Sequence, residues 1–533
     1  MNIKRLMRIV TMISYIVFFM IIERMLGCAG AGIVALATMT YSVLFTFIMG
    51  SMKDTLAKMV SIRRHRGFFD NANRVFGYCI AYTVVAGAVM LAVFALFSRG
   101  FGMFMFGDGS IDTVLMILGV FFLIDSVARS IKGYYIGCGG SFVLTIAEAV
   151  KCVFLIALSP FLVKFFSGIG NKAANLHKVD FLVDVYGAFG AVLSMCVADL
   201  LMLIILLFGL KSAMHNDSFS FNEVRSRDGF KSFLRAFISP AFEKLAENIF
   251  PLIIIFAVVC MYCRNCFAHN YSSKQVYENI GTLFIPGLAA TVFALLMYRE
   301  YISMNKKKLR TDYKKDDRKS LVSDFTILLK NAVTIVFPAC LSLIIFSGSI
   351  PKCIFGCETV EAEKIVLLCG ITALFAGLDI AFANALDSIG HESLSLLGRL
   401  IGFVSAGILM FAFGKREPQL SSVVIAVMLY YIVCTIVHGT FAIKDIAIRP
   451  NDILAKLIKV LIACASLSIV DVVVAKLLHV NLVILIVGII VGYVAYVVTL
   501  VLIKGVSKKD IQGMSGALLY YPLTFAGNIF RVR

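Results

Sequence analysis

The sequence predicts an all-α, polytopic membrane protein built from two similar helical lobes. Composition is the first observation. Of 533 residues, 60% are hydrophobic and 15% charged, and the mean hydropathy is +0.92, whereas a soluble protein is about half apolar and about one quarter charged. The second observation is a series of apolar runs that reach the roughly 20 residues needed to cross a bilayer as a helix. The third is an internal repeat. The runs are continuous and not alternating, which excludes a β-barrel.

The apolar runs predict about fourteen transmembrane helices. We place them, in order, at 7–27, 31–50, 76–98, 111–131, 141–163, 185–209, 237–261, 280–299, 323–346, 362–385, 395–413, 420–442, 453–475 and 480–503. The small residues between Gly27 and Gly32 allow a tight turn between the first two.

The distribution of Lys and Arg predicts the orientation of the chain. With the N-terminus inside, basic residues are roughly three times as frequent in cytoplasmic as in outer segments, as the positive-inside rule requires. Both termini are therefore expected in the cytoplasm of a multi-pass cell-membrane protein. The net charge of +18 is explained by basic loops that face anionic lipid headgroups, so membrane lipids are the expected partners and nucleic acid is not.

One pattern occurs twice along the chain. Phe106-Gly107 and Ile136-Gly137 in the first half match Phe355-Gly356 and Ile389-Gly390 in the second, at a nearly constant offset of about 250 residues, which indicates a duplicated lobe. Six predicted helices separate the copies. Because six is even, the two lobes have the same orientation in the membrane. Such a repeat is typical of a transporter with its site between the halves.

The repeat predicts the domain organisation. An N-lobe, a cytoplasmic linker, a C-lobe, a pair of added helices and a cytoplasmic tail are expected at 1–210, 211–236, 237–445, 446–505 and 506–533.

Charged residues inside the apolar spans are the candidate functional residues. A charge at the bilayer centre costs about 2.5–3.5 kcal/mol on insertion scales, so such residues face the bundle interior or water. For binding an anionic substrate we select Arg24, Lys151 and Arg399. For ion coupling or charge pairing we select the acidic residues Glu23, Glu148, Glu243, Glu247 and Asp379.

Other charges in the spans have a simpler interpretation. Asp125, Arg129 and Lys132 share one face of a helix. For Arg129, Lys132 and Lys244, which lie near cytoplasmic ends, we favour structural pairing or snorkelling to the interface. Asp199 stays open between the two interpretations.

No enzymatic or metal site is predicted. The chain has no Gly-rich phosphate loop that ends in Gly-Lys-Ser/Thr and no catalytic constellation, so we expect a non-enzyme without cofactors. Any driving energy would come from an ion gradient or the membrane potential. Among the fourteen cysteines, Cys263 and Cys266, and Cys353 and Cys357, fall in predicted outer loops. Each pair permits a disulfide or zinc but is a weak signal for either.

Four segments carry a resemblance to a known family. They read ERMLGCAGAGIVALATMTYSVLFTF, KDTLAKMVSIRRHRGFFDNANRVF, KGYYIGCGGSFVLTIAEAVKCVFLI and PGLAATVFALLMYREY. In this order, over about 1–445, they resemble the multidrug/oligosaccharidyl-lipid/polysaccharide (MOP) exporter superfamily. The branch they resemble is that of the polysaccharide exporters, with stage V sporulation protein B and the lipid II flippases. The family's Glu-Gln-x-x-Arg is Glu148-Ala-x-Lys151 here, which keeps the charges and loses the amide.

The resemblance implies a two-lobe bundle that works by alternating access. Its substrate would be an undecaprenyl-pyrophosphate-linked saccharide, a precursor for peptidoglycan, polysaccharide or a sporulation-specific cell wall, moved from the inner to the outer leaflet. H⁺ or Na⁺ are the candidate coupling ions. Three alternatives remain: a cation or multidrug antiporter of the same superfamily with a mainly acidic cavity, a scaffold of a cell-wall or spore-coat complex, and a membrane-embedded glycosyltransferase.

Overall fold

The described part of the chain is almost entirely helical. The computed structural model describes residues 3–140, 142–215, 230–288, 309–315, 317–413, 418–446, 450–477, 481–507 and 522–524, and these ranges contain no β-strand. Within them, twelve helices are long and apolar enough to cross a membrane. The predicted all-α, multi-pass fold is therefore confirmed.

The first of these helices contains a break at the position where the sequence predicts a turn. Helix α1 runs from Ile3 to Met49, and Gly27 inside it has φ 66° and ψ −175°. Glycine adopts a positive φ at little cost, so the chain leaves the helix there and starts again. The break separates the first two predicted spans. The predicted span at 280–299 lies mostly outside the described residues, so the total of fourteen spans stays a prediction.

The helices pack into two compact units, Met1–Gly281 and Thr282–Arg533. The helices of the first unit are α1, α2 (Met52–His65), α3 (Phe69–Phe106), α4 (Asp112–Gly137), α5 (Phe142–His177), α6 (Phe181–His215), α7 (Phe230–Ala268) and α8 (Ser273–Thr282). Those of the second are η1 (Leu283–Leu288), α10 (Arg318–Ile345), η2 (Pro351–Phe355), α11 (Val360–Ser388), α12 (Glu392–Phe413), α13 (Leu420–Ile446), α14 (Pro450–Leu477) and α15 (Asn481–Leu502). By packing, the division falls after Gly281, so α7 belongs with the first unit. Whether the lobes predicted at 1–210 and 237–445 move as bodies stays a prediction.

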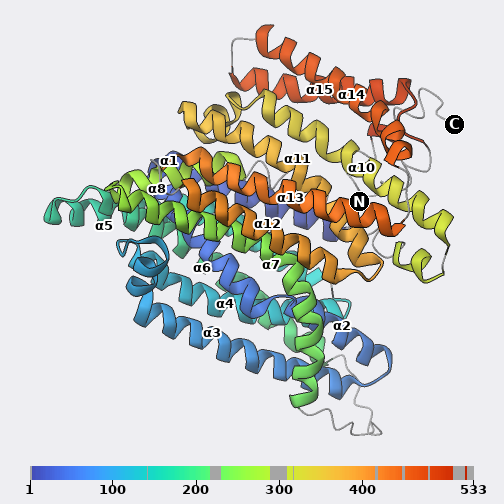
Figure 1. The fold of residues 1–533 in the computed structure, drawn as a ribbon. Helices are drawn as coiled ribbons and strands as arrows, with labels where there is room; N and C mark the ends of the chain where they lie inside the picture. The colour runs from blue at the N-terminus through green and yellow to red at the C-terminus, as the bar shows by residue number, and fades with distance from the viewer. Residues whose placement is uncertain are drawn as a thin grey trace. The chain divides into compact units, whose positions relative to one another are not determined.

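Within the first unit, α4 packs against α3 and α6, and α5 packs against α6 and α1 (Figure 1). Small residues allow the close approach of α3 and α4. A Cβ atom on Gly119 of α4 would lie 2.9 Å from the Cα of Leu91 on α3, nearer than real carbon atoms approach. Small residues of this kind let transmembrane helices pack backbone to backbone. The arrangement brings the charged middle of α4 beside α1, α5 and α6.

The second unit repeats part of this packing. Helix α11 packs against α10 and α13, and α12 packs against α13. The added helices α14 and α15 pair with each other, and α14 also contacts α10 (Figure 1). A polar contact lies at that junction: the Ser342 hydroxyl donates to Oδ2 of the buried Asp471 at 2.9 Å. A Cβ on Gly492 of α15 would overlap the other oxygen of Asp471.

The repeated Phe-Gly pairs have the same local structure. Phe106 ends α3, and Gly107 follows it with φ 84°. Phe355 ends η2, and Gly356 follows it with φ 82°. Both phenylalanines are buried. A left-handed glycine is a common helix terminator because the residue lacks a Cβ, so the two copies of the pattern stop their helices in the same way.

Candidate functional site

Three helices of the first unit, α4, α5 and α6, bring ionised side chains together, and α1 adds aromatic partners. Asp125 of α4 is buried at 4% exposure. The Tyr41 hydroxyl of α1 donates a short hydrogen bond to Asp125 Oδ2. Arg129 Nε donates to the same oxygen at 3.0 Å. Asp125 and Arg129 are four residues apart on one helix, a spacing that places both on one face, so the sequence alone fixes this pair.

The Arg129 guanidinium also contacts an aromatic ring. Its Cζ atom lies 4.0 Å from the centroid of Phe45 on α1, a geometry that gives a cation–π attraction. The Arg129 side chain nevertheless keeps 43% of its surface exposed. It therefore stands at the accessible edge of the cluster, while Asp125 stands inside it.

Lys151 of α5 and Asp199 of α6 form a deeply buried ion pair. Lys151 Nζ lies 2.5 Å from Asp199 Oδ1, and the side chains are 11% and 0% exposed. Lys151 Nζ also lies 5.5 Å from the ring centroid of Tyr15 on α1. Among the described residues, Asp199 Oδ2 has no hydrogen-bond partner. Asp199 is thus paired, and its role in a hydrated cavity stays a prediction.

Glu148 of α5 pairs with α4. Its Oε1 lies 3.6 Å from Lys132 Nζ. Glu148 and Lys151 share a face of α5 but bind partners on different helices. The whole cluster contains three acidic and three basic groups, so it is formally neutral. Buried ions are tolerated when they are paired in this way, and removal of one partner leaves an uncompensated charge.

The second unit holds a smaller cluster of a different kind. His438 of α13 is fully buried, and its Nδ1 lies 2.6 Å from Oδ1 of Asp379 on α11. Its Nε2 lies 2.8 Å from the backbone carbonyl oxygen of Ser395 on α12. A Cβ on Gly398 would overlap the imidazole, so this glycine gives α12 its close approach. Arg399, one residue further on α12, is 7% exposed.

The two clusters occupy corresponding helices of the repeat. Asp125 and Asp379 lie on α4 and α11, which end at the matching Ile-Gly pairs. Asp199 lies 18 residues after the first residue of α6 (181 to 199), and His438 lies 18 residues after that of α13 (420 to 438). Helices α6 and α13 therefore each carry a buried polar residue, which belongs to an ion-pair network in the first unit and to a His-Asp pair in the second.

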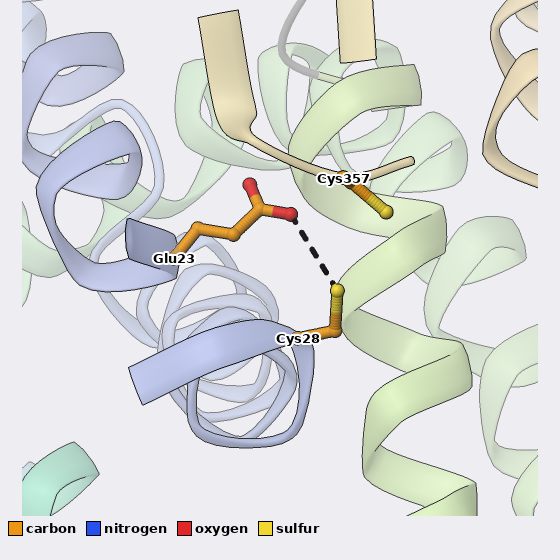
Figure 2. A group of neighbouring side chains, drawn as sticks. All are labelled: Glu23, Cys28 and Cys357. Carbon is orange, nitrogen blue, oxygen red and sulfur yellow. Dashed lines mark hydrogen bonds between the residues drawn. The ribbon is translucent and has the colours of Figure 1, made fainter. Parts of the chain in front are cut away.

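Glu23 and Arg24 lie just before the break in α1. Glu23 is 4% exposed, whereas Arg24 is exposed. Cys28 Sγ donates a weak hydrogen bond of 3.7 Å to Glu23 Oε1 across the turn at Gly27 (Figure 2). Just before the turn, the acidic side chain is thus buried and its basic neighbour is accessible.

The side chains of three other residues named in the sequence analysis are not described by the structure. Glu243, Lys244 and Glu247 are on α7, within the stretch 211–248 whose side chains are not described. Their predicted roles stay predictions.

The structure has Cys263 and Cys266 as thiols and not as a disulfide. Cys263 and Cys266 lie inside α7 and are buried, so the expectation that they occupy an outer loop is wrong. Helix α7 extends to Ala268, beyond the predicted end of its span, because the polar residues Arg264 and Asn265 continue the helix at the end of the apolar run.

His438 was not selected from the sequence. The signal was a single histidine in an otherwise apolar run, 420–442. Its partners on α11 and α12 are 59 and 43 residues away along the chain, so no local spacing could reveal the pair.

Solved structures of two kinds of transporter share this fold. A structure of "Lipid II flippase MurJ" in an inward closed conformation matches with TM-score 0.60 and 15% identity, over 93% of this chain and 98% of that one. An inward-facing "multidrug resistance MATE family transporter of the MOP superfamily" matches with TM-score 0.57 and 11% identity, over 82% and 94%. An outward-facing structure with the same description matches with TM-score 0.52 and 15% identity, over 84% and 95%. Neither a protein-family model nor a curated protein matches the sequence.

Proposed function

We propose that this chain is a membrane transporter of the MOP superfamily that flips a lipid-linked saccharide. In the proposal, an undecaprenyl-pyrophosphate-linked precursor of cell-wall polymer moves from the inner to the outer leaflet by alternating access. The protein lies in the cell membrane with both termini in the cytoplasm and catalyses no chemical reaction. The lobes 1–210 and 237–445 would rock about the substrate, and 446–505 would add two further helices.

The observation that carries this proposal is the six-membered ionic network in the first unit. A fold shared with both a lipid II flippase and MATE transporters is compatible with several substrates. The network adds two cations, Lys132 and Lys151, in the interior of an apolar bundle and a third, Arg129, at its accessible edge. Charges so placed are costly and are typical of substrate or ion pathways in membrane proteins.

A pyrophosphate group would enter this network by exchange. Lys151 is held by Asp199 and Lys132 by Glu148, so an anionic headgroup would take the place of a carboxylate beside one of the lysines. Charge-assisted hydrogen bonds to phosphate oxygens are strong and short, and they would offset part of the cost of separating the lysine from its carboxylate. Arg24 at the Gly27 turn and Arg399 on α12 remain our further candidates for headgroup contacts.

Transport of a labelled lipid tests the proposal. The protein is reconstituted into vesicles of phosphatidylethanolamine and phosphatidylglycerol that contain an NBD-labelled undecaprenyl-pyrophosphate disaccharide. Dithionite, which does not cross the membrane, quenches only outer-leaflet label. Flipping is expected to bring the inner-leaflet label within reach of dithionite as well. If the fraction of label that stays unquenched equals that in protein-free vesicles, the proposal is contradicted.

A multidrug or cation antiporter of the same superfamily is the second candidate. The observation in its favour is the equal number of acidic and basic groups in the network, which leaves no net positive charge to select an anion. The same vesicles, loaded with a fluorescent organic cation and given a proton gradient, separate the two functions. Cation efflux without lipid flipping would favour the antiporter.

A further inference from the structure

The contacts of His438 determine where its protons are. Its Nε2 faces the carbonyl oxygen of Ser395 at 2.8 Å. A backbone carbonyl can only accept a hydrogen bond, so Nε2 carries a hydrogen and donates it. In a neutral imidazole, one nitrogen is a donor and the other an acceptor. A neutral His438 would therefore present a bare lone pair at Nδ1.

That Nδ1 faces Oδ1 of Asp379 at 2.6 Å. An ionised carboxylate is also acceptor-only, so two lone pairs would repel each other at this distance. The contact is attractive only when a proton lies between the two atoms. The proton can belong to the imidazolium or to the carboxylic acid; in either case the pair holds one proton more than a neutral histidine beside a carboxylate.

The surroundings favour a pair that carries no net charge. His438 is fully buried and Asp379 is 6% exposed. On α10, the side chain that meets Gly377, two residues before Asp379, is the apolar Val336. Tyr430 and Cys434 on α13 interact electrostatically both with Asp379 and with Arg399 on α12. Burial of an unpaired charge is unfavourable, and the shared proton avoids it.

The same contact ties three helices together. Through His438, α13 is joined to Asp379 on α11 and to Ser395 on α12. Removal of the proton would turn the link between α11 and α13 into a repulsion while the link to α12 remains. The protonation state is thus coupled to the packing of α11 against α13.

We infer that His438 and Asp379 form a proton-binding site in the second unit, with Ser395 as the residue that positions the imidazole. The ligand is one proton, bound between Nδ1 and Oδ1 in the helix packing seen here. The site deepens the proposed function because it names H⁺ as the coupling ion. Only the link to transport rests on that function; proton binding does not.

A second His-Asp contact in the same unit supplies a matched control. His391 Nδ1 lies 2.5 Å from Oδ2 of Asp445 on α13, but these side chains are 39% and 22% exposed. Water can hydrate this pair, so its protonation is not tied to helix packing. A His391→Gln variant should therefore behave as the native protein in every measurement on the buried pair.

Nitrogen-15 NMR on histidine-labelled protein in lipid bilayers tests the site directly. Among the signals of the seven histidines, those of His438 and His391 are identified because one signal pair disappears in His438→Gln and another in His391→Gln. At pH 7.5, His438 is expected to show a protonated Nε2 and an Nδ1 whose shift reports a shared or bound proton. In Asp379→Asn, which keeps the side-chain shape, the Nδ1 shift should change. A bare Nε2, an Nδ1 with a free lone pair, or a spectrum unaffected by Asp379→Asn would overturn the inference.

Transport under a proton gradient tests the coupling. In vesicles with the membrane potential held at zero by valinomycin and equal K⁺, one pH unit corresponds to about a tenfold bias in lipid distribution for one coupled proton. Asp379→Asn and His438→Gln should abolish the bias, and His391→Gln should keep it. A bias that survives in both pair variants would overturn the coupling. If the NMR result holds and no lipid moves in any vesicle, the proposed function fails and the proton site stands.

Discussion

Asp199 and His438 occupy corresponding points of two repeated helices, each 18 residues after the first residue of α6 or α13. Each contacts a polar side chain on a neighbouring helix. Asp199 forms an ion pair with Lys151 of α5, and His438 is hydrogen-bonded to Asp379 of α11. The two helices thus carry polar residues of different chemistry at the same count from their first residues. One copy holds fixed charges, and the other holds a group that can exchange a proton.

Loss of Lys151 should destabilise the first unit. Lys151→Met leaves Asp199 fully buried without its cation, and breaking a buried pair costs about 3–5 kcal/mol. The midpoint of thermal unfolding in detergent, followed by size exclusion, should fall. Lys151→Met combined with Asp199→Asn should recover most of the loss because no uncompensated charge remains.

The control for this change is Lys352→Met. Lys352 pairs with Glu358 at 3.2 Å, with both side chains exposed to 45% and 66%. An exposed pair contributes about 0–1 kcal/mol. Equal effects of Lys151→Met and Lys352→Met would contradict the burial of the network.

The Tyr41 hydroxyl should contribute more than an ordinary tyrosine hydroxyl. Tyr41→Phe removes a hydrogen bond to the Asp125 carboxylate, and bonds to charged groups contribute about 1.5–3 kcal/mol. Tyr82→Phe removes a bond to the backbone oxygen of Ile48, for which about 0.5–1.5 kcal/mol is expected. The midpoint of thermal unfolding should therefore be lower for Tyr41→Phe than for Tyr82→Phe. The reverse order would rule out a charged acceptor for the Tyr41 hydroxyl.

The break in α1 should require glycine. At φ 66° and ψ −175°, Gly27→Ala forces a residue with a Cβ into a backbone conformation that is essentially restricted to glycine, at about 1–3 kcal/mol. Gly77 lies inside α3 with no atom near its missing Cβ, so Gly77→Ala should be neutral or stabilising by up to about 1 kcal/mol. A tolerated Gly27→Ala, measured by the yield of monodisperse protein and its unfolding midpoint, would argue against the break.

The junction of α14 and α15 with α10 should be sensitive to size at one position. Gly492→Val would push a side chain into Asp471 and disturb its bond from Ser342, and overpacking costs typically about 1–3 kcal/mol. Gly407→Val on α12 enters open space and should change little. Limited proteolysis of the two variants reports whether α14 and α15 detach, and equal cleavage would contradict this packing.

The sequence predicted what local spacing can encode. The turn at Gly27 followed from a cluster of small residues, and the Asp125–Arg129 pair followed from helical periodicity. The helix on which each charge lies was also predictable. What could not be predicted was the choice of partners: Glu148 pairs with Lys132 and Lys151 with Asp199 because of how α4, α5 and α6 pack, which depends on many weak contacts between distant segments.

His438 shows the same limit more sharply. A lone histidine in an apolar span has no pattern to mark it, and its role depends on Asp379 and Ser395 in two other helices. The prediction that Cys263 and Cys266 lie in an outer loop was wrong for a different reason. The apolar run that defined the predicted span ends where polar residues begin. The helix continues to Ala268 because backbone hydrogen bonds do not depend on apolar side chains.

The central claim is that the ionic network of the first unit handles an anionic lipid headgroup. The most direct test is flipping of the NBD-labelled undecaprenyl-pyrophosphate disaccharide by native protein, by Lys151→Gln combined with Asp199→Asn, and by Lys352→Gln, in vesicles with equal amounts of folded protein. The double variant removes one acidic and one basic group, so the net charge of the network is unchanged and no ion is left unpaired. We predict native rates for Lys352→Gln and loss of flipping in the double variant. Native rates in the double variant would contradict the claim.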